Sequence, residues 1–306
     1  MLSLEIILNW SLMLITLYLS IYYLLLLFEE KKRESKGEKE PEVTFVIPAY
    51  NEEKHVERAL ESILRLDYPK EKIKVIVVDD GSRDKTFEVA KKFAQEHKEV
   101  EIEVIRHEKN KGKAAALNTA LKRINTPYFV TMDADSFADK KALKEVLKKA
   151  KDNSVVTACV LPARVGSFVE KIQEIEYLFS NYLANILSKF DAQTVAPGPF
   201  SLYKTDVIKK IGGFDEKAPA EDLEIVFRLR KHGYSMEFAP NAVVYTEIPE
   251  KFKELVKQRR RWKLGTLDAI EKHASFIIPK DVFSEQIFLT VIFSFGVILL
   301  FFLILY

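Results

Sequence analysis

The feature that most constrains the fold is a regular alternation of short β-branched runs with segments of helical period. Runs rich in Val and Ile begin at residues 43, 73, 102, 128 and 154. Between them lie amphipathic segments with apolar residues three or four positions apart, at 51–66, 84–97, 113–124 and 140–151. This order predicts an α/β fold in which a mostly parallel sheet is flanked by helices. Ligands of such sheets bind beyond the carboxyl ends of the strands, so the residues that follow each strand are the first site candidates.

The rhythm changes after Val160. A long amphipathic segment at 168–190 is followed by a Pro/Gly interruption, APGPF at 196, and by a GGF turn at 212. Residues 221–231 predict a helix stopped by Gly233, and residues 252–264 predict a strongly basic amphipathic helix. We therefore expect a second half that contributes its own functional residues.

Two long apolar runs lie at the ends of the chain, at 6–28 and 287–306, and each is long enough to cross a bilayer as a helix. The first run lacks a preceding basic cluster and a small-residue cleavage site, so it reads as an anchor rather than a signal peptide. Four basic residues between Lys31 and Lys36 follow it, and positive residues tend to stay cytoplasmic. We predict a multi-pass cell-membrane protein with these segments: transmembrane anchor 1–29, linker 30–41, cytoplasmic domain 42–270, interfacial segment 271–285 and transmembrane helix 286–306.

Composition removes several classes of function. The formal net charge is only +2, with Lys and Arg interleaved among Asp and Glu, so the broad basic field of a nucleic-acid-binding protein is missing. A single cysteine, Cys159, rules out disulfides within the chain and multi-cysteine metal sites. Cys159 lies in an apolar run, which favours a buried packing thiol over a reactive one.

Polar clusters follow the first two predicted strands. PAYNE at 48 lies between a strand and a helix, where Asn51 could simply cap the helix. DDGS at 79 follows the next strand. Its adjacent carboxylates need donors, which ribose hydroxyls or a base N–H could supply, while a structural turn is the alternative.

Further charged residues follow the third and fourth strands. Lys113, in NKGKAAALN, begins a helix whose free N–H groups favour anions, although a solvated first-turn lysine is the alternative. Asp133 and Asp135, in DAD, are separated by one residue at a strand end. Such carboxylates can converge on a hard cation while a diphosphate supplies further oxygens.

The second half contains two more charged motifs. Glu221 and Asp222 begin a helix, where they could complement the helix dipole or provide a general base for a hydroxyl group. QRRRW at 258 lies on the basic helix and fits a membrane-surface helix with an interfacial Trp. Alternatively, Arg261 neutralises a leaving diphosphate and Trp262 stacks on a sugar ring.

Taken in order, PAYNE at 48, DDGS at 79, NKGKAAALN at 110, DAD at 133, AED at 220 and QRRRW at 258 resemble family 2 glycosyltransferases. The resemblance covers about residues 42–270 and is greatest to the processive branch of cellulose, chitin, hyaluronan and poly-N-acetylglucosamine synthases. It implies a GT-A, Rossmann-like fold. One departure is Ala220, where the family commonly has Thr. Another is the number of predicted membrane helices, one on each side of the domain, where processive relatives usually have several.

The resemblance also implies roles for individual residues. Its donor-binding residues are Pro48, Tyr50, Glu52, Asp80, Lys113 and Asp133. Asp133 and Asp135 match the metal motif, for Mg²⁺ or Mn²⁺, and Asp135 is the expected direct ligand. Asp222 matches the general base, beside Glu221. The motif associated with the diphosphate and the acceptor sugar consists of Gln258, Arg261 and Trp262.

The implied reaction is inverting, metal-dependent transfer of a glucose or N-acetylglucosamine type sugar from a UDP-sugar to a growing β-linked glycan, at the cytoplasmic face of the lipid bilayer. One alternative is a single addition to a polyprenyl phosphate or another lipid acceptor. Another is a catalytically inactive, nucleotide-binding membrane scaffold, against which the intact Asp135 and Asp222 argue. The resemblance is also compatible with a homo-oligomer.

Overall fold

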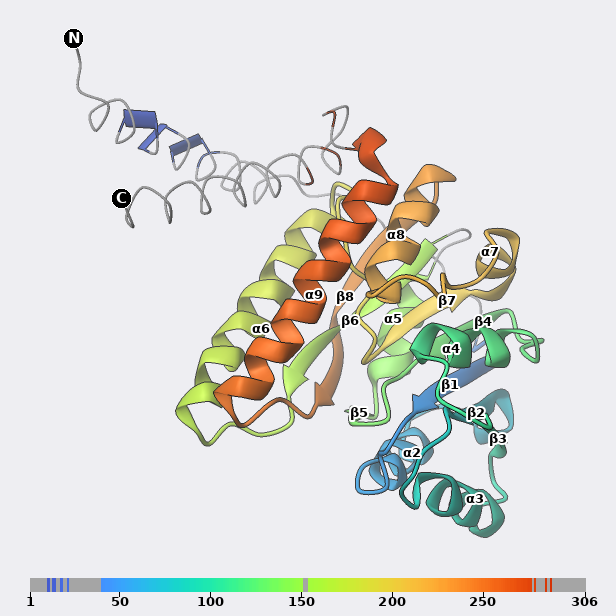
Figure 1. The fold of residues 1–306 in the computed structure, drawn as a ribbon. Helices are drawn as coiled ribbons and strands as arrows, with labels where there is room; N and C mark the ends of the chain where they lie inside the picture. Colours follow the sequence, from blue (N-terminus) through green and yellow to red (C-terminus); the bar gives the residue numbers. More distant parts are fainter. Residues whose placement is uncertain are drawn as a thin grey trace. The chain divides into compact units, whose positions relative to one another are not determined.

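The computed structural model describes residues 40–150 and 154–276, together with ten isolated positions: 10, 11, 13, 14, 17, 18, 21, 278, 284 and 287. The chain divides into a small unit, Met1–Arg33, and a large unit, Glu34–Tyr306. The large unit holds the sheet and all the elements described below (Figure 1).

The described residues of the large unit form one eight-stranded sheet in the order β3-β2-β1-β4-β7-β6-β8-β5. Its pairings make the sheet mixed, because β5 and β7 run opposite to the other six strands. The strands are β1 (Val43–Ala49), β2 (Ile73–Asp79), β3 (Glu101–Arg106), β4 (Tyr128–Thr131), β5 (Ser136–Ala138), β6 (Ser154–Pro162), β7 (Ser201–Lys204) and β8 (Ser235–Thr246).

Helices cover both faces of this sheet, as the alternating sequence pattern requires. Two short 3₁₀ turns, η1 (Lys70–Lys72) and η2 (Ala274–Phe276), accompany them. The helices are α2 (Val56–Leu64), α3 (Thr86–Glu96), α4 (Lys113–Leu121), α5 (Ala142–Lys149), α6 (Phe168–Ser188), α7 (Thr205–Lys210), α8 (Glu221–Lys231) and α9 (Phe252–Lys272).

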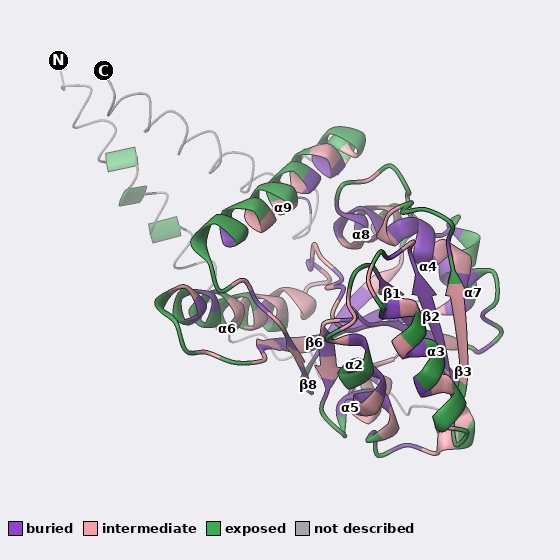
Figure 2. Ribbon diagram, turned by 60° about the horizontal axis from the view of Figure 1, so that its bottom comes forward, coloured by how far each residue is buried: buried purple, intermediate pink, exposed green. Residues whose placement is uncertain are grey.

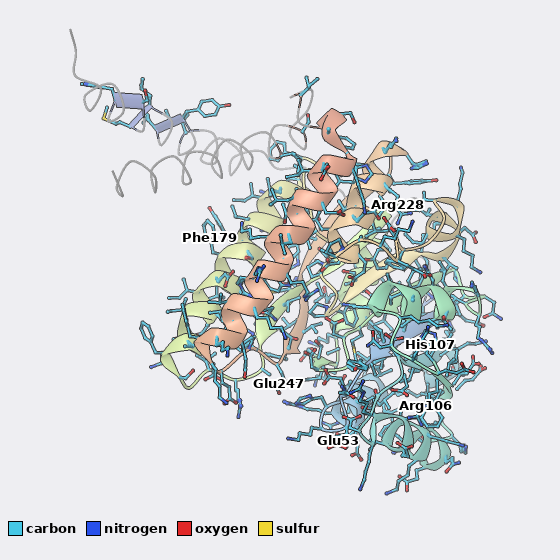
Figure 3. All side chains as sticks on the ribbon, viewed as in Figure 1. Glu53, Arg106, His107, Phe179, Arg228 and Glu247 are labelled. Atoms are coloured by element: carbon cyan, nitrogen blue, oxygen red, sulfur yellow. The ribbon has the colours of Figure 1, made fainter. Side chains whose placement is uncertain are left out.

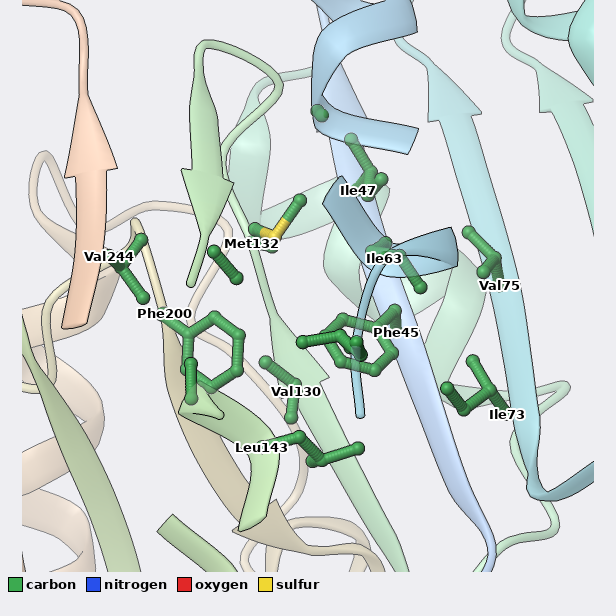
Figure 4. Close-up of a cluster of buried hydrophobic side chains, with 14 of the residues drawn as sticks. Phe45, Ile47, Ile63, Ile73, Val75, Val130, Met132, Leu143, Phe200 and Val244 are labelled. Carbon is green, nitrogen blue, oxygen red and sulfur yellow. The ribbon is translucent and has the colours of Figure 1, made fainter. Parts of the chain in front are cut away.

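Two apolar clusters form the core, one on each face of the sheet, because successive strand residues point to opposite faces. Phe45 and Ile47 of β1 pack with α2, α3 and α5, and Figure 4 shows this cluster. Val46, between them in the sequence, packs with α4, α7, α8 and α9 on the other face. These strands are therefore buried on both sides, which explains their nearly continuous apolar runs.

The predicted α/β fold with flanking helices is confirmed. Helix α8 has the predicted bounds, whereas α9 continues past the predicted end at residue 264 to Lys272. Three strands were not predicted. Strands β5 and β7 have three and four residues, too few to show a period. Strand β8 was missed because Pro240 and the exposed Asn241 interrupt its apolar pattern. Its pairing with the neighbouring strand β6 shifts register at this point, between Ala158 and Cys159.

The predicted membrane segments 1–29 and 286–306 lie outside the described residues apart from a few positions, as do residues 30–39 of the predicted linker. Among the residues that are described, no helix combines the length and apolar character needed to cross a membrane.

Candidate active site

Three charged side chains meet where strands β1 and β4 end. Asp133 follows β4, and its Oδ1 lies 2.5 Å from Nζ of Lys113, the first residue of α4. The same ammonium lies 3.3 Å from Oε1 of Glu221, the first residue of α8. Burial opposes the charge on Lys113, but the carboxylates of Asp133, Glu221 and Asp222 outweigh it and raise the Lys113 pKa above its ordinary value. Lys113 thus joins the two predicted halves of the site.

Asp135 faces two further carboxylates. Burial, followed by the charges of Asp133 and Glu52, raises the pKa of Asp135. Its Oδ1 accepts hydrogen bonds from Ser136 Oγ at 3.2 Å and Thr246 Oγ1 at 3.4 Å. Burial and neighbouring negative charge disfavour the ionised Asp135 carboxylate, and a hard divalent cation offsets that charge, so Asp133 and Asp135 fit Mg²⁺ or Mn²⁺.

No group of three or more His, Cys, Asp or Glu side chains is placed to hold a metal ion among the described residues. An ion held by Asp133 and Asp135 would therefore need oxygens from another source, and a diphosphate provides them.

Asp222 lies one residue after Glu221 on the first turn of α8. Burial and the Glu221 carboxylate raise the pKa of Asp222 to about 6, while Lys113 and Arg261 act in the opposite direction. The backbone of Asp222 is fixed, because its carbonyl accepts a hydrogen bond from the Ala196 N–H at 3.0 Å. The loop before β7 therefore holds the first turn of α8, which carries this carboxylate. A carboxylate whose pKa approaches neutrality is suited to accept a proton.

Helix α9 places the QRRRW motif beside α6 (Figure 1). Arg259 makes a bidentate ion pair with Glu176 of α6, in which the shortest N···O distance is 2.6 Å. Its guanidinium also stacks 4.0 Å from the ring centre of Trp262 and donates to Gln258 Oε1 at 2.5 Å. Arg261 is exposed on α9, and its charge acts to lower the pKa of Asp222. Arg259 thus attaches the helix to α6, whereas a direct contact of Arg261 with the reacting groups stays a prediction.

A cavity of about 470 Å³ lies between α6, α9 and the sheet. Asp222 lines it on one side and Trp262 on another, and Gly198 belongs to its wall. A Cβ on Gly198 would lie 2.2 Å from Lys113 Nζ and 2.8 Å from Asp133 Oδ2. The loop 193–199 therefore borders both this cavity and the charged cluster, and Asp222 is accessible from the cavity.

The PAYNE and DDGS motifs interlock at the ends of β1 and β2. Asn51 has a positive φ of 59° and does not cap α2, whose N-cap is His55. Its backbone N–H donates to Ser82 Oγ at 2.9 Å, and its Oδ1 accepts from the Arg83 N–H. Pro48 is partly buried in β1, and Tyr50 is exposed beside it.

Asp80 is buried, and its carboxylate already has hydrogen-bond partners within the protein. Its carboxylate accepts hydrogen bonds from the backbone N–H groups of Lys111 and Gly112, the latter at 2.7 Å, and lies 2.7 Å from His107 Nδ1. His107 Nε2 in turn lies 2.9 Å from Thr119 Oγ1 of α4. Asp80 thus holds the loop that presents Lys113, and its direct contact with a nucleotide stays a prediction.

Several residues of this region carried no sequence signal. Tyr177 of α6 lines the cavity, and burial, with the charges of Asp135 and Asp133 among the causes, raises its pKa to about 12. Glu176 and His107 were also missed, because each acts through a partner far away in the sequence. The Pro/Gly interruption at 196 was the one available clue to the wall formed by Gly198.

Comparison with known proteins identifies the family. The family model described as Glycosyl transferase family 2 matches residues 44–212. The chain belongs to this family of glycosyltransferases. The match begins in β1 and ends after α7, so it contains Lys113, Asp133 and Asp135 but not Glu221, α8 or α9.

Curated relatives extend the similarity beyond that segment. A poly-beta-1,6-N-acetyl-D-glucosamine synthase of Staphylococcus epidermidis is 31% identical over 261 residues, which cover 80% of this chain and 60% of the relative. The probable glycosyltransferase YdaM of Bacillus subtilis is 30% identical over 232 residues, 74% of this chain and 55% of the relative. The chain thus spans little more than half the length of these relatives.

Solved structures share the fold. The mannosyltransferase PcManGT of Pyrobaculum calidifontis, in complex with GDP-Man and Mn²⁺, has a TM-score of 0.74 and 24% identity, and the match covers 88% of this chain and 76% of the other. Residues 1–349 of TarS from S. aureus, in complex with UDP-GlcNAc, have a TM-score of 0.51 and 20% identity over 69% of this chain and 59% of the other. Both likenesses agree with the predicted GT-A fold.

Proposed function

We propose that the chain catalyses inverting, metal-dependent transfer of a glucose or N-acetylglucosamine type sugar from a UDP-sugar to a growing β-linked glycan, at the cytoplasmic face of the cell membrane. One observation carries the proposal. The Asp222 carboxylate stands between the charged cluster around Lys113 and the cavity lined by Trp262. The relative named as a poly-beta-1,6-N-acetyl-D-glucosamine synthase supports the choice of sugar.

The donor occupies the strand-end side of the site in this proposal. Pro48, Tyr50 and Glu52 line the region for the nucleoside, where the ends of β1 and β2 interlock. Asp133 and Asp135 would hold Mg²⁺ or Mn²⁺ together with the diphosphate. When bound, this ion supplies positive charge that stabilises the leaving diphosphate.

The acceptor occupies the cavity. Its hydroxyl oxygen bonds to the anomeric carbon while Asp222 accepts the hydroxyl proton, and the bond from that carbon to the diphosphate oxygen breaks with its electron pair going to the diphosphate. Arg261 and Lys113 stabilise the charge that develops on this leaving group. Trp262 offers an aromatic face for the terminal sugar. A single displacement of this kind inverts the configuration.

A stripe of exposed apolar residues on α6 supports attachment of the domain to a bilayer. Its members recur every three or four positions and are between 46% and 77% exposed: Phe168, Ile172, Ile175, Phe179 and Tyr182. Figure 3 shows Phe179 on the outer side of the helix. Both α6 and α9 also remain exposed over much of their surface (Figure 2). An apolar stripe of this size favours a membrane surface, to which the apolar runs at the chain ends also point.

Single addition to a polyprenyl phosphate or another lipid acceptor is the second candidate. The observation in its favour is the apolar wall that Leu183, Leu187 and Phe238 give the cavity. Product length separates the candidates, because a ladder of oligomers indicates repeated addition and one added sugar indicates a lipid acceptor.

The decisive experiment incubates detergent-solubilised protein with Mn²⁺ and a panel of nucleotide sugars, and measures released nucleoside diphosphate. The panel contains UDP-glucose and UDP-N-acetylglucosamine, and also GDP-mannose because the solved mannosyltransferase binds that donor. Release from a UDP-sugar that needs Mn²⁺ is expected. Release from no donor, with the Asp135→Asn protein behaving identically to the wild type, contradicts the proposal.

A further inference from the structure

Gly265 lies in the interior of α9, where the helix backbone touches Ala220. A Cβ on Gly265 would lie 2.3 Å from the Ala220 Cβ and 3.1 Å from the Ala220 backbone nitrogen. Carbon atoms do not approach so closely, so any side chain at 265 forces α9 away from Ala220. Glycine in a helix interior costs about 1 kcal/mol relative to alanine, which calls for a reason to keep it. The close approach of the two helices is that reason.

This contact lies beside the reacting groups. Ala220 is the N-cap of α8, so Glu221 and Asp222 follow it directly. On α9, Arg261 precedes Gly265 by four residues and shares its face of the helix, and Trp262 precedes it by three. The distance between the backbones at residues 220 and 265 therefore determines the gap between Trp262 and Asp222 across the cavity.

Other contacts hold α9 on either side of Gly265. Near its end, His273 Nε2 lies 3.3 Å from Glu224 Oε1 of α8, and the His273 ring stacks on Phe227 at 5.4 Å. Near its start, Arg259 pairs with Glu176 of α6. With both ends held, a displacement at the middle tilts the segment that carries Arg261 and Trp262.

We propose that Gly265 and Ala220 are positioning residues that set the gap between Trp262 and Asp222, and thereby the fit of the acceptor glycan in the cavity. This inference rests on the proposed function, which places the acceptor there. The residues proposed to bind the donor and its metal ion, among them Glu52, Asp133 and Asp135, lie outside α8 and α9, so donor binding is expected not to depend on this distance.

The test is a pair of variants of the full chain, Gly265→Ala and the double variant Gly265→Ala/Ala220→Gly. The first adds the Cβ. The second removes the nearest atom that it meets, the Ala220 Cβ, and leaves the Ala220 backbone nitrogen at 3.1 Å, which requires only a small shift. Both substitutions suit their local structure, because alanine favours a helix interior and glycine is preferred over alanine at an N-cap. A loss of folding is therefore not the expected outcome for either protein, and the thermal midpoint checks it.

The expected result is a loss of about ten- to a hundredfold in kcat/KM for the acceptor in Gly265→Ala, since a misplacement of about 1 Å can cost that much. UDP affinity, measured by calorimetry with Mn²⁺, stays that of the wild type. The double variant recovers most of the lost transfer. Leu264→Ala, which changes an exposed neighbour on α9, serves as the control and keeps wild-type transfer.

A second readout is independent of activity. In a Trp10→Phe background, Trp262 is the only tryptophan, so its emission maximum and acrylamide quenching report the gap. Both should change in Gly265→Ala and return in the double variant. Wild-type transfer and emission in Gly265→Ala, or a double variant as impaired as the single one, overturn the inference. If the wild type releases nucleoside diphosphate from no donor, the proposed function fails. Trp262 emission in the wild type, Gly265→Ala and the double variant still decides whether the contact between Gly265 and Ala220 sets the gap between Trp262 and Asp222.

Discussion

Replacing Asp222 by Asn should stabilise the protein while it removes transfer activity. Burial and Glu221 raise the pKa of Asp222 from 3.8 to about 6, so the folded protein disfavours the ionised carboxylate. Above pH 6 this penalty is fully present, between pH 6 and 4 it diminishes, and below pH 4 Asp222 is protonated in both folded and unfolded chains. Asn has nearly the same shape and no charge. The variant therefore escapes a penalty that the wild type bears at neutral pH.

The size of the effect follows from the pKa. A rise from 3.8 to about 6 corresponds to roughly 3 kcal/mol against the charged form. Asp222 is only partly buried, and solvent screening reduces this figure, so we expect about 1 to 3 kcal/mol. Thermal unfolding of the metal-free and donor-free protein should show a higher midpoint for Asp222→Asn at pH 8 and a much smaller difference at pH 4, close to the unfolded pKa of 3.8.

Transfer should fall in the same variant by about 10² to 10⁴-fold, the usual contribution of a general base, while UDP binding is retained. Asp215→Asn is the matched control. Hydrogen bonding to the Lys217 N–H and the charge of Lys272 lower the pKa of Asp215, so its loss should reduce the midpoint at pH 8. A lower midpoint for Asp222→Asn at pH 8, or a gain at pH 4 as large as the gain at pH 8, would refute the electrostatic reasoning. Near-normal turnover would remove Asp222 as the base.

Three further predictions test other parts of the site. Asp135→Asn should abolish metal-dependent UDP binding in calorimetry while the fold persists in circular dichroism, because it removes the proposed metal ligand. Arg261→Lys should lose at least about tenfold in transfer rate, on the order of 1.4 kcal/mol, and Trp262→Phe should weaken acceptor use or shorten products; wild-type rates in detergent contradict both. Trp substituted for Phe179 in reconstituted vesicles should be quenched by brominated lipids, whereas Trp at the exposed Lys92 of α3 should not.

Much of the strand-end chemistry could be predicted from the sequence because it depends on local order. Residues that follow parallel strands lie at the same edge of the sheet. Asp133 after β4 and Glu52 after β1 were therefore expected to lie close together. The same reasoning placed Lys113 at the start of a helix near anions. In the structure Lys113 forms an ion pair with Asp133, and its contact with a diphosphate stays a prediction.

Other contacts depend on tertiary packing, which local order does not specify. Asp80 resembles a free carboxylate in the sequence, yet the backbone of residues 111 and 112 occupies it in the fold. Arg259 could not be distinguished from its basic neighbours until Glu176 of α6 proved to be its partner. A side chain whose partner lies some 80 residues away leaves no periodic trace.

Glycine explains both an error and a feature of the site. The basic helix was predicted to end at residue 264, directly before Gly265, and glycine often follows the end of a helix. In the structure α9 continues through Gly265, and the missing side chain serves close approach to Ala220 instead. Gly198 does the same beside Lys113. Thus the loop beside the charged cluster around Lys113 and the helix beside the cavity both come close to the proposed catalytic residues because each has a glycine, with no side chain, at the point of contact. From the sequence, glycine is usually interpreted as a turn residue because of its backbone freedom. In the structure, Gly198 and Gly265 instead lie where neighbouring atoms leave no room for a Cβ, and such close packing becomes visible only in the folded protein.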